Sequence, residues 1–178
     1  AAVRDPATGI TWLASENRHA IHRFAADGTP DGRRVLADEV DWLPNQGIEA
    51  MVRLADGRFV VLREDGGDLF VYPGDPVTGA VADQGRVAWP ADYSPTDVAQ
   101  LPDGRLVVVL RRVALAMPVF ECRLVLLDLA GWQPGEVLHP QPLVQLEDLV
   151  PRENWEAVAV EPAAGGAEAL LSACIAPS

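Results

Sequence analysis

The chain has 178 residues, 49% of them apolar, which is enough for one globular domain with a sizeable core. Its net charge is -12, and its basic residues are arginines scattered singly or in pairs, whereas a nucleic-acid binder carries a basic stripe. No apolar run reaches the roughly 18 to 20 residues that cross a bilayer, and no signal segment stands at the start of this chain. We therefore expect no nucleic-acid partner and no membrane span.

One sequence phrase recurs along the chain. Residues 47–62 return as 95–110, more loosely as 154–162 followed by 169–172, and the template also fits 1–6 with 11–14. Self-similarity at a period of roughly 40 to 50 residues is typical of a propeller or an array. We predict one domain over 1–178, incomplete at both ends, with repeat units at about 1–46, 47–94, 95–153 and 154–178.

Each copy predicts a short antiparallel sheet. In the second and third copies, Asp-Gly-Arg separates two apolar stretches, the pattern of two strands joined by a tight hairpin. A further strand follows in each full copy, and then a weaker outer strand. In chain order, these are expected at 20–24 and 32–36, at 68–72 and 85–89, and at 123–127 and 143–146. With no long helical period, the sequence predicts an all-β, β-propeller-like fold of about three full blades and a partial one, each with three to four antiparallel strands.

Acidic residues recur at one position of the first strand. Glu49 and Glu156 are equivalent in the repeat, whereas Asp97 stands one place later, and a bulge introduced by Pro95 would turn it inward. The first strands of propeller blades line the central channel, so side chains at equivalent positions gather there. We expect these three carboxylates to face one axis.

A second set of equivalent residues lies at the end of the second predicted strand of each copy. Glu16 and Glu64 correspond to each other, and Arg111 and Ala173 take this place in the third and fourth copies. Converging carboxylates repel one another unless a hard cation such as Ca²⁺ keeps them ionised. The predicted metal ligands are thus Glu16, Glu49, Glu64, Asp97 and Glu156. The alternative is structural: the acids bind neighbouring strand amides or arginines and hold the blades in register.

Other candidate residues carry weaker signals. His19 and His22 lie three apart in a predicted strand, and alternation would point them to opposite faces, away from a shared metal. Cys122 and Cys174 lack a Cys-x-x-Cys spacing, and either a disulfide or two thiols fits them. No Gly-x-Ser-x-Gly nucleophile motif occurs.

Several motifs follow one another along the chain, at 16–24, 43–50, 95–97 with 101–105, 111–112, 127–131, 134–135 and 154–160. This ordered set resembles the bacterial phytase-like family described as "esterase-like activity of phytase". The resemblance covers nearly the whole chain and implies a β-propeller loosely similar to the calcium-dependent phytases. It also implies a periplasmic or secreted bacterial protein. The chain departs from the family pattern at Leu110, where a glutamate is usual, and after Ser172, where two further acids are usual.

Two functions are compatible with these features. The first is a calcium-dependent phosphoesterase acting on a small phosphorylated or ester substrate, with Glu49, Glu156 and Arg111 as catalytic residues and with Arg18, His19 and Arg112 as substrate-binding residues. The second is a non-catalytic propeller that binds a ligand or a protein, with structural acids. Because three blades and a stub do not close a propeller, we also expect self-association through open blade edges.

Overall fold

A computed structural model describes the chain as two compact units, Ala1–Gly85 and Arg86–Ser178. The described residues are 1–15, 18–36, 42, 47–64, 66–79, 82–114, 120–162 and 169–175. Apart from one short 3₁₀ turn, every regular element in this part of the chain is a β-strand. The prediction of an all-β chain built from antiparallel sheets is therefore confirmed.

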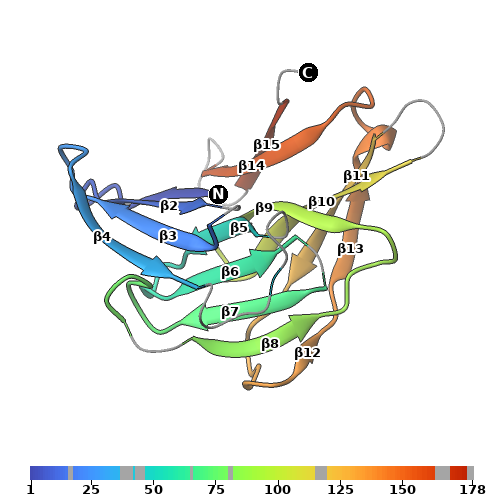
Figure 1. The fold of residues 1–178 in the computed structure, drawn as a ribbon. Coiled ribbons are helices and arrows are strands. Elements are labelled where there is room, and N and C mark those ends of the chain that lie inside the picture. The colour runs from blue at the N-terminus through green and yellow to red at the C-terminus, as the bar shows by residue number, and fades with distance from the viewer. Residues whose placement is uncertain are drawn as a thin grey trace. The chain divides into compact units, whose positions relative to one another are not determined.

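The first sheet occupies the start of the first unit (Figure 1). Its strands β1 (Ala2–Arg4), β2 (Thr11–Ser15), β3 (Ala20–Phe24) and β4 (Pro30–Val35) pair antiparallel with their neighbours in chain order. The outer strand β4 is mostly exposed. Its apolar pattern is correspondingly weak, which is why the sequence predicted its start two residues late, at Gly32.

The second sheet repeats this order. It contains β5 (Ile48–Arg53), β6 (Phe59–Arg63), β7 (Asp68–Tyr72) and β8 (Asp83–Val87). Side chains from both sheets form the core of the first unit, where the rings of Trp12 and Phe59 meet edge to face at 4.9 Å between centroids.

The second unit holds the third sheet. Strands β9 (Ser94–Gln100), β10 (Leu106–Val113), β11 (Phe120–Leu127) and β13 (Gln141–Gln145) follow one another across it, and the 3₁₀ turn η1 (Leu146–Asp148) comes next. The two-residue strand β12 (Val137–Leu138) lies between β11 and β13 in the chain and pairs in parallel with Arg86 and Val87 at the end of β8. The repeat did not predict this parallel strand.

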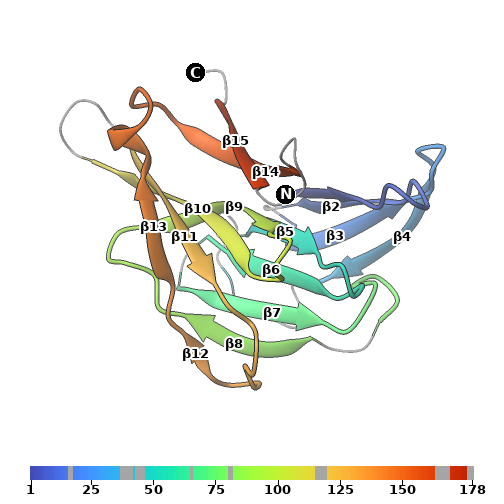
Figure 2. The ribbon, with the colours of Figure 1, turned by 180° about the vertical axis from the view of Figure 1, so that it is seen from behind.

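A two-stranded sheet follows, seen from both sides in Figures 1 and 2. It consists of β14 (Trp155–Pro162) and β15 (Ala169–Ile175), paired antiparallel. β14 also packs against β9 and β10. Trp155 and Val158 of β14 complete a buried cluster with Val107 and Val109 of β10 and Cys122 of β11, so these three strands share one core.

The Asp-Gly-Arg hairpins have the same geometry in the second and third copies. Gly57 and Gly104 have φ of 91° and 92°, the left-handed region that glycine adopts without strain. In each turn the aspartate accepts a hydrogen bond from the arginine Nε at 2.8 Å. The repeated sequence therefore builds a repeated turn.

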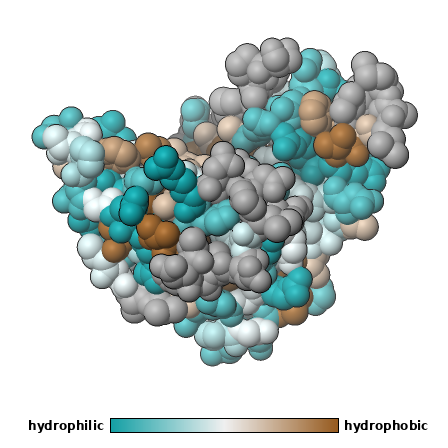
Figure 3. Space-filling view, in the orientation of Figure 1, coloured by the Kyte–Doolittle hydropathy of each residue, from teal (hydrophilic) through white to brown (hydrophobic). Residues whose placement is uncertain are grey.

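The described surface is largely hydrophilic on the face drawn in Figure 3, and its hydrophobic residues form small separate patches. No helix among the described residues is both long and apolar enough to span a membrane.

Candidate functional site

A β-bulge recurs in the first strand of three sheets. Glu49 is the extra residue of β5, since Ile48 pairs with Arg63 while Ala50 pairs with Leu62. The extra residues of β9 and β14 are Thr96 and Glu156. These three residues share one position of the sequence repeat, and bulges re-aim side chains and are frequent beside active sites. The predicted bulge next to Pro95 is present, and the residue it displaces from the ladder is Thr96.

Glu156 belongs to a closed triangle of polar side chains in the second unit. Arg111 Nη1 donates to Asn154 Oδ1 at 2.8 Å and to Glu156 Oε1, and Asn154 Nδ2 donates to the same Oε1 at 2.7 Å. The side chains of Arg111 and Glu156 are 23% and 39% exposed. The triangle is thus held in place and still open to solvent.

Neighbouring residues fix the arginine of this triangle. Arg111 lies on β10 opposite Cys122 of β11, and its guanidinium carbon is 5.6 Å from the centroid of the Phe120 ring. The backbone N–H of Cys122 donates to Glu147 Oε1 at 2.6 Å, which ties β11 to the turn η1. Burial raises the pKa of the Cys122 thiol, so the thiol remains protonated, and its Sγ donates to the Glu153 carbonyl oxygen at 3.6 Å.

Asp97 is bound to the neighbouring hairpin. Its Oδ2 accepts a hydrogen bond from the backbone N–H of Val158 on β14 at 2.8 Å. Desolvation raises the pKa of Asp97 although this hydrogen bond favours the ionised form. The contact is of the kind that the structural alternative predicted: an acid that holds the amide of an adjacent strand.

The remaining predicted ligands belong to the first unit. Glu49 and Glu64 are half-buried, and each takes part in a polar interaction. Glu16 lies outside the described residues. Within the described part of the chain, no group of three or more histidine, cysteine or acidic side chains is arranged to hold a metal ion.

The predicted substrate-binding residues lie in different environments. Arg18 is exposed, whereas His19 is 6% exposed and its ring meets that of Trp42 edge to face at 5.6 Å between centroids. Strand β3 begins at Ala20, so the prediction that His19 lies in a strand was wrong: it occupies the preceding turn with φ of 44°. Arg112 lies in the second unit and forms an ion pair with Glu121, in which Nη2 and Oε2 are 2.5 Å apart.

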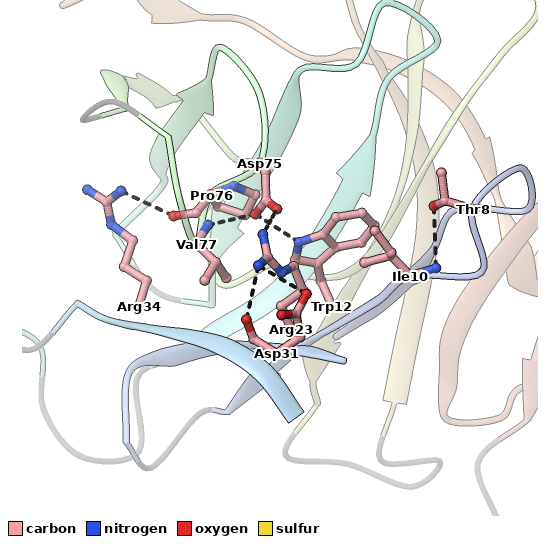
Figure 4. Close-up of polar contacts among 9 residues, drawn as sticks. All are labelled: Thr8, Ile10, Trp12, Arg23, Asp31, Arg34, Asp75, Pro76 and Val77. Carbon is pink, nitrogen blue, oxygen red and sulfur yellow. Dashed lines mark hydrogen bonds and ion pairs between the residues drawn. The ribbon is translucent and has the colours of Figure 1, made fainter. Parts of the chain in front are cut away.

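Figure 4 shows a polar network in the first unit that sequence reasoning missed. Asp75 follows β7 and accepts hydrogen bonds from Trp12 Nε1 at 3.0 Å, from Arg23 Nη1 at 2.5 Å and from the N–H of Val77 at 2.8 Å. Desolvation opposes ionisation, yet these three bonds lower the pKa of Asp75. Asp75 therefore fastens the loop after β7 to the first sheet. The only sequence signal was an aspartate between Gly74 and Pro76.

The model of the phytase-like family, described as "Esterase-like activity of phytase", matches residues 2–173. The chain therefore belongs to the phytase-like family. The comparison with curated proteins found no match.

Proposed function

We propose that the chain is a calcium-dependent phosphoester hydrolase with a β-propeller fold, active in the bacterial periplasm or outside the cell. Family membership supports a hydrolase of phytase-like type. Three sheets have strands that follow the order of the repeat, and in the described part of the chain a fourth sheet contains the first two strands. These sheets support the propeller, in which each sheet is one blade.

The observation that carries the proposal is the triangle of Arg111, Asn154 and Glu156. Every hydrogen bond described for Arg111 leaves from Nη1. A guanidinium has five N–H donors, so the others are available for the oxygens of a phosphoryl group. Asn154 holds Glu156 beside this arginine, where the carboxylate is placed to orient a water molecule or a cation.

The donor chemistry of Glu156 suits calcium. Both hydrogen bonds to its carboxylate end on Oε1, and within the described part of the chain none reaches Oε2. A carboxylate oxygen is the type of ligand that Ca²⁺ prefers, and the Glu156 side chain is 39% exposed. When bound, calcium would supply charge stabilisation for the phosphoryl oxygens and would lower the pKa of a coordinated water. That Glu16, Glu49, Glu64 and Asp97 also bind calcium stays a prediction.

A second candidate function is a non-catalytic propeller that binds a ligand or protein. It is favoured by the hydrogen bond from Val158 N–H to Asp97, because an acid that satisfies a strand amide has a structural role without any metal. In that case the bond between Arg111 and Glu156 joins β10 to β14 and does no chemistry.

Hydrolysis of an aryl phosphate in the presence of calcium tests the proposal. We expect Glu156→Gln and Arg111→Gln each to lower kcat/KM by about 100-fold or more, because each removes charge from the reacting site. Glu161→Gln, which changes an exposed acid of the same strand, is the matched control and should keep the wild-type rate. Wild-type protein without activity, or equal activity in Glu156→Gln, Glu49→Gln and wild type, would contradict the assignment.

A further inference from the structure

A second group of arginines lies on the other face of the third sheet. Arg111 and Arg112 are neighbours on β10 and point to opposite faces. Arg112 pairs across the sheet with Glu121, and Arg123 follows Glu121 two residues later on β11, on the same face. Both guanidiniums lie against one buried ring, that of Tyr93, with their central carbons 5.1 and 3.9 Å from its centroid.

Positive charge exceeds negative charge in this group. Glu121 is shared, because its Oε2 accepts from Arg112 Nε at 2.8 Å while its Oε1 lies 4.0 Å from Arg152 Nη1. The hydrogen bond that Arg112 donates to Glu121 is the largest cause of the raised pKa of this guanidinium, and the charge of Asp92 also raises it. Three guanidiniums thus face two carboxylates, in a chain whose net charge is -12.

The side chain of Arg123 makes no ion pair and no hydrogen bond within the described part of the chain. Its Nε is buried and has no acceptor. A buried donor without an acceptor costs free energy, and most such groups in proteins are satisfied by a partner or a ligand. Stacking on Tyr93 occupies one face of the guanidinium, whereas its N–H bonds lie in the guanidinium plane, where an oxyanion binds.

We infer that Tyr93, Arg112, Arg123 and Arg152 form a binding site for a phosphate-type oxyanion. The ring of Tyr93 sets the orientation of two guanidiniums, Arg123 supplies unused donors, and Arg152 adds charge from a 45% exposed position. The site lies on the opposite face of the sheet from Arg111. Arg112 was predicted from the sequence as a substrate-binding residue, but the inference rests on the contacts of these four residues and does not depend on the hydrolase proposal.

Calorimetric titration with inorganic phosphate and with phenylphosphonate, which is not hydrolysed, tests the inference. We expect wild-type protein to bind at least one of them, with affinity that falls as salt rises. Arg123→Gln should weaken binding by about tenfold or more, the loss of one charge-assisted contact. Arg105→Gln, at the exposed hairpin, is the control and should bind as wild type. Equal affinity for both compounds identifies the bare oxyanion as the ligand, and tighter phenylphosphonate binding identifies a phosphoryl group on an organic molecule.

Two results would overturn the inference: no binding of either compound by wild type, or unchanged binding by Arg123→Gln. If Arg123→Gln does not fold, Arg152→Glu replaces it, because Arg152 is exposed and its substitution leaves the packing on Tyr93 intact. This variant should also weaken binding, and wild-type affinity in Arg152→Glu would count against the site. Retained activity of either variant on the aryl phosphate separates this site from the one at Arg111.

Discussion

At the scale of single residues, Asp97 is the acid for which a structural role can be tested separately from metal binding. Its carboxylate accepts from Val158 N–H, and desolvation raises its pKa above the ordinary 3.8. A raised pKa means that the native state binds more protons than the unfolded state between 3.8 and the raised value. The associated stability is complete below pH 3.8 and is lost as pH rises through the native pKa.

Two substitutions at Asp97 should change the free energy of unfolding differently, as measured by urea unfolding with chelator present. At pH 7, Asp97→Ala should be less stable than wild type by about 1 to 2 kcal/mol, because Val158 N–H loses its acceptor. Asp97→Asn keeps an acceptor and cannot ionise, so it should match or exceed wild type at pH 7, with the gain disappearing near pH 3. Equal destabilisation by the two substitutions at pH 7 would refute this account of the contact.

The limits of sequence reasoning are clear at single residues. The repeat identified Glu49 and Glu156 as equivalent. In the structure each is the extra residue of a β-bulge, Glu49 in β5 and Glu156 in β14, because backbone geometry follows the repeat. It did not predict that Arg111 would bond Asn154 and Glu156, since 43 and 45 residues separate these partners and the packing of β14 on β10 brings them together. It also did not predict the burial of His19, which depends on Trp42 from a later loop.

At the scale of elements, Asp75 joins the loop after β7 to the first sheet. Asp75→Ala removes three hydrogen bonds and leaves Trp12 Nε1 and Arg23 Nη1 without an acceptor. The side chains of Arg23 and Asp75 are only 16% and 23% exposed. We expect a loss of about 2 kcal/mol at pH 7. Asp56→Ala breaks an ion pair at an exposed hairpin and should cost less than about 1 kcal/mol.

The effect of Asp75 should depend on pH. Because its native pKa is below 3.8, its contribution is present above that value and is lost as pH falls through the native pKa. The difference in unfolding free energy between wild type and Asp75→Ala should therefore shrink in acid. A difference that stays constant from pH 7 to pH 2, or that equals the effect of Asp56→Ala, would contradict the role of the network.

Strand prediction succeeded where the apolar pattern was strong. The strand expected at 68–72 has the bounds of β7, because its residues are largely buried and end at Gly and Pro punctuation. The exposed outer strands β4, β8 and β13 each begin two residues before the expected start. The parallel strand β12 has only two residues, too few for any periodic signal.

At the scale of the whole molecule, self-association stays a prediction. In the described part of the chain, β15 pairs only with β14, whereas β2, β6 and β10 at the same repeat position each have two strand neighbours. An exposed strand edge is a template for pairing with another chain. We expect light scattering to give a mass above 19.1 kDa that rises with protein concentration. A mass of one chain at every concentration would refute the prediction.

The most direct test of the central claim is thermal melting during a calcium titration, with and without chelator. A cation that binds only the native state raises Tm, by an amount that grows with its concentration. We predict a calcium-dependent rise in wild type and in Glu161→Gln that chelator reverses, and a much smaller rise in Glu156→Gln. A wild-type Tm that does not change with calcium would contradict the account, as would a rise in Glu156→Gln equal to that of wild type.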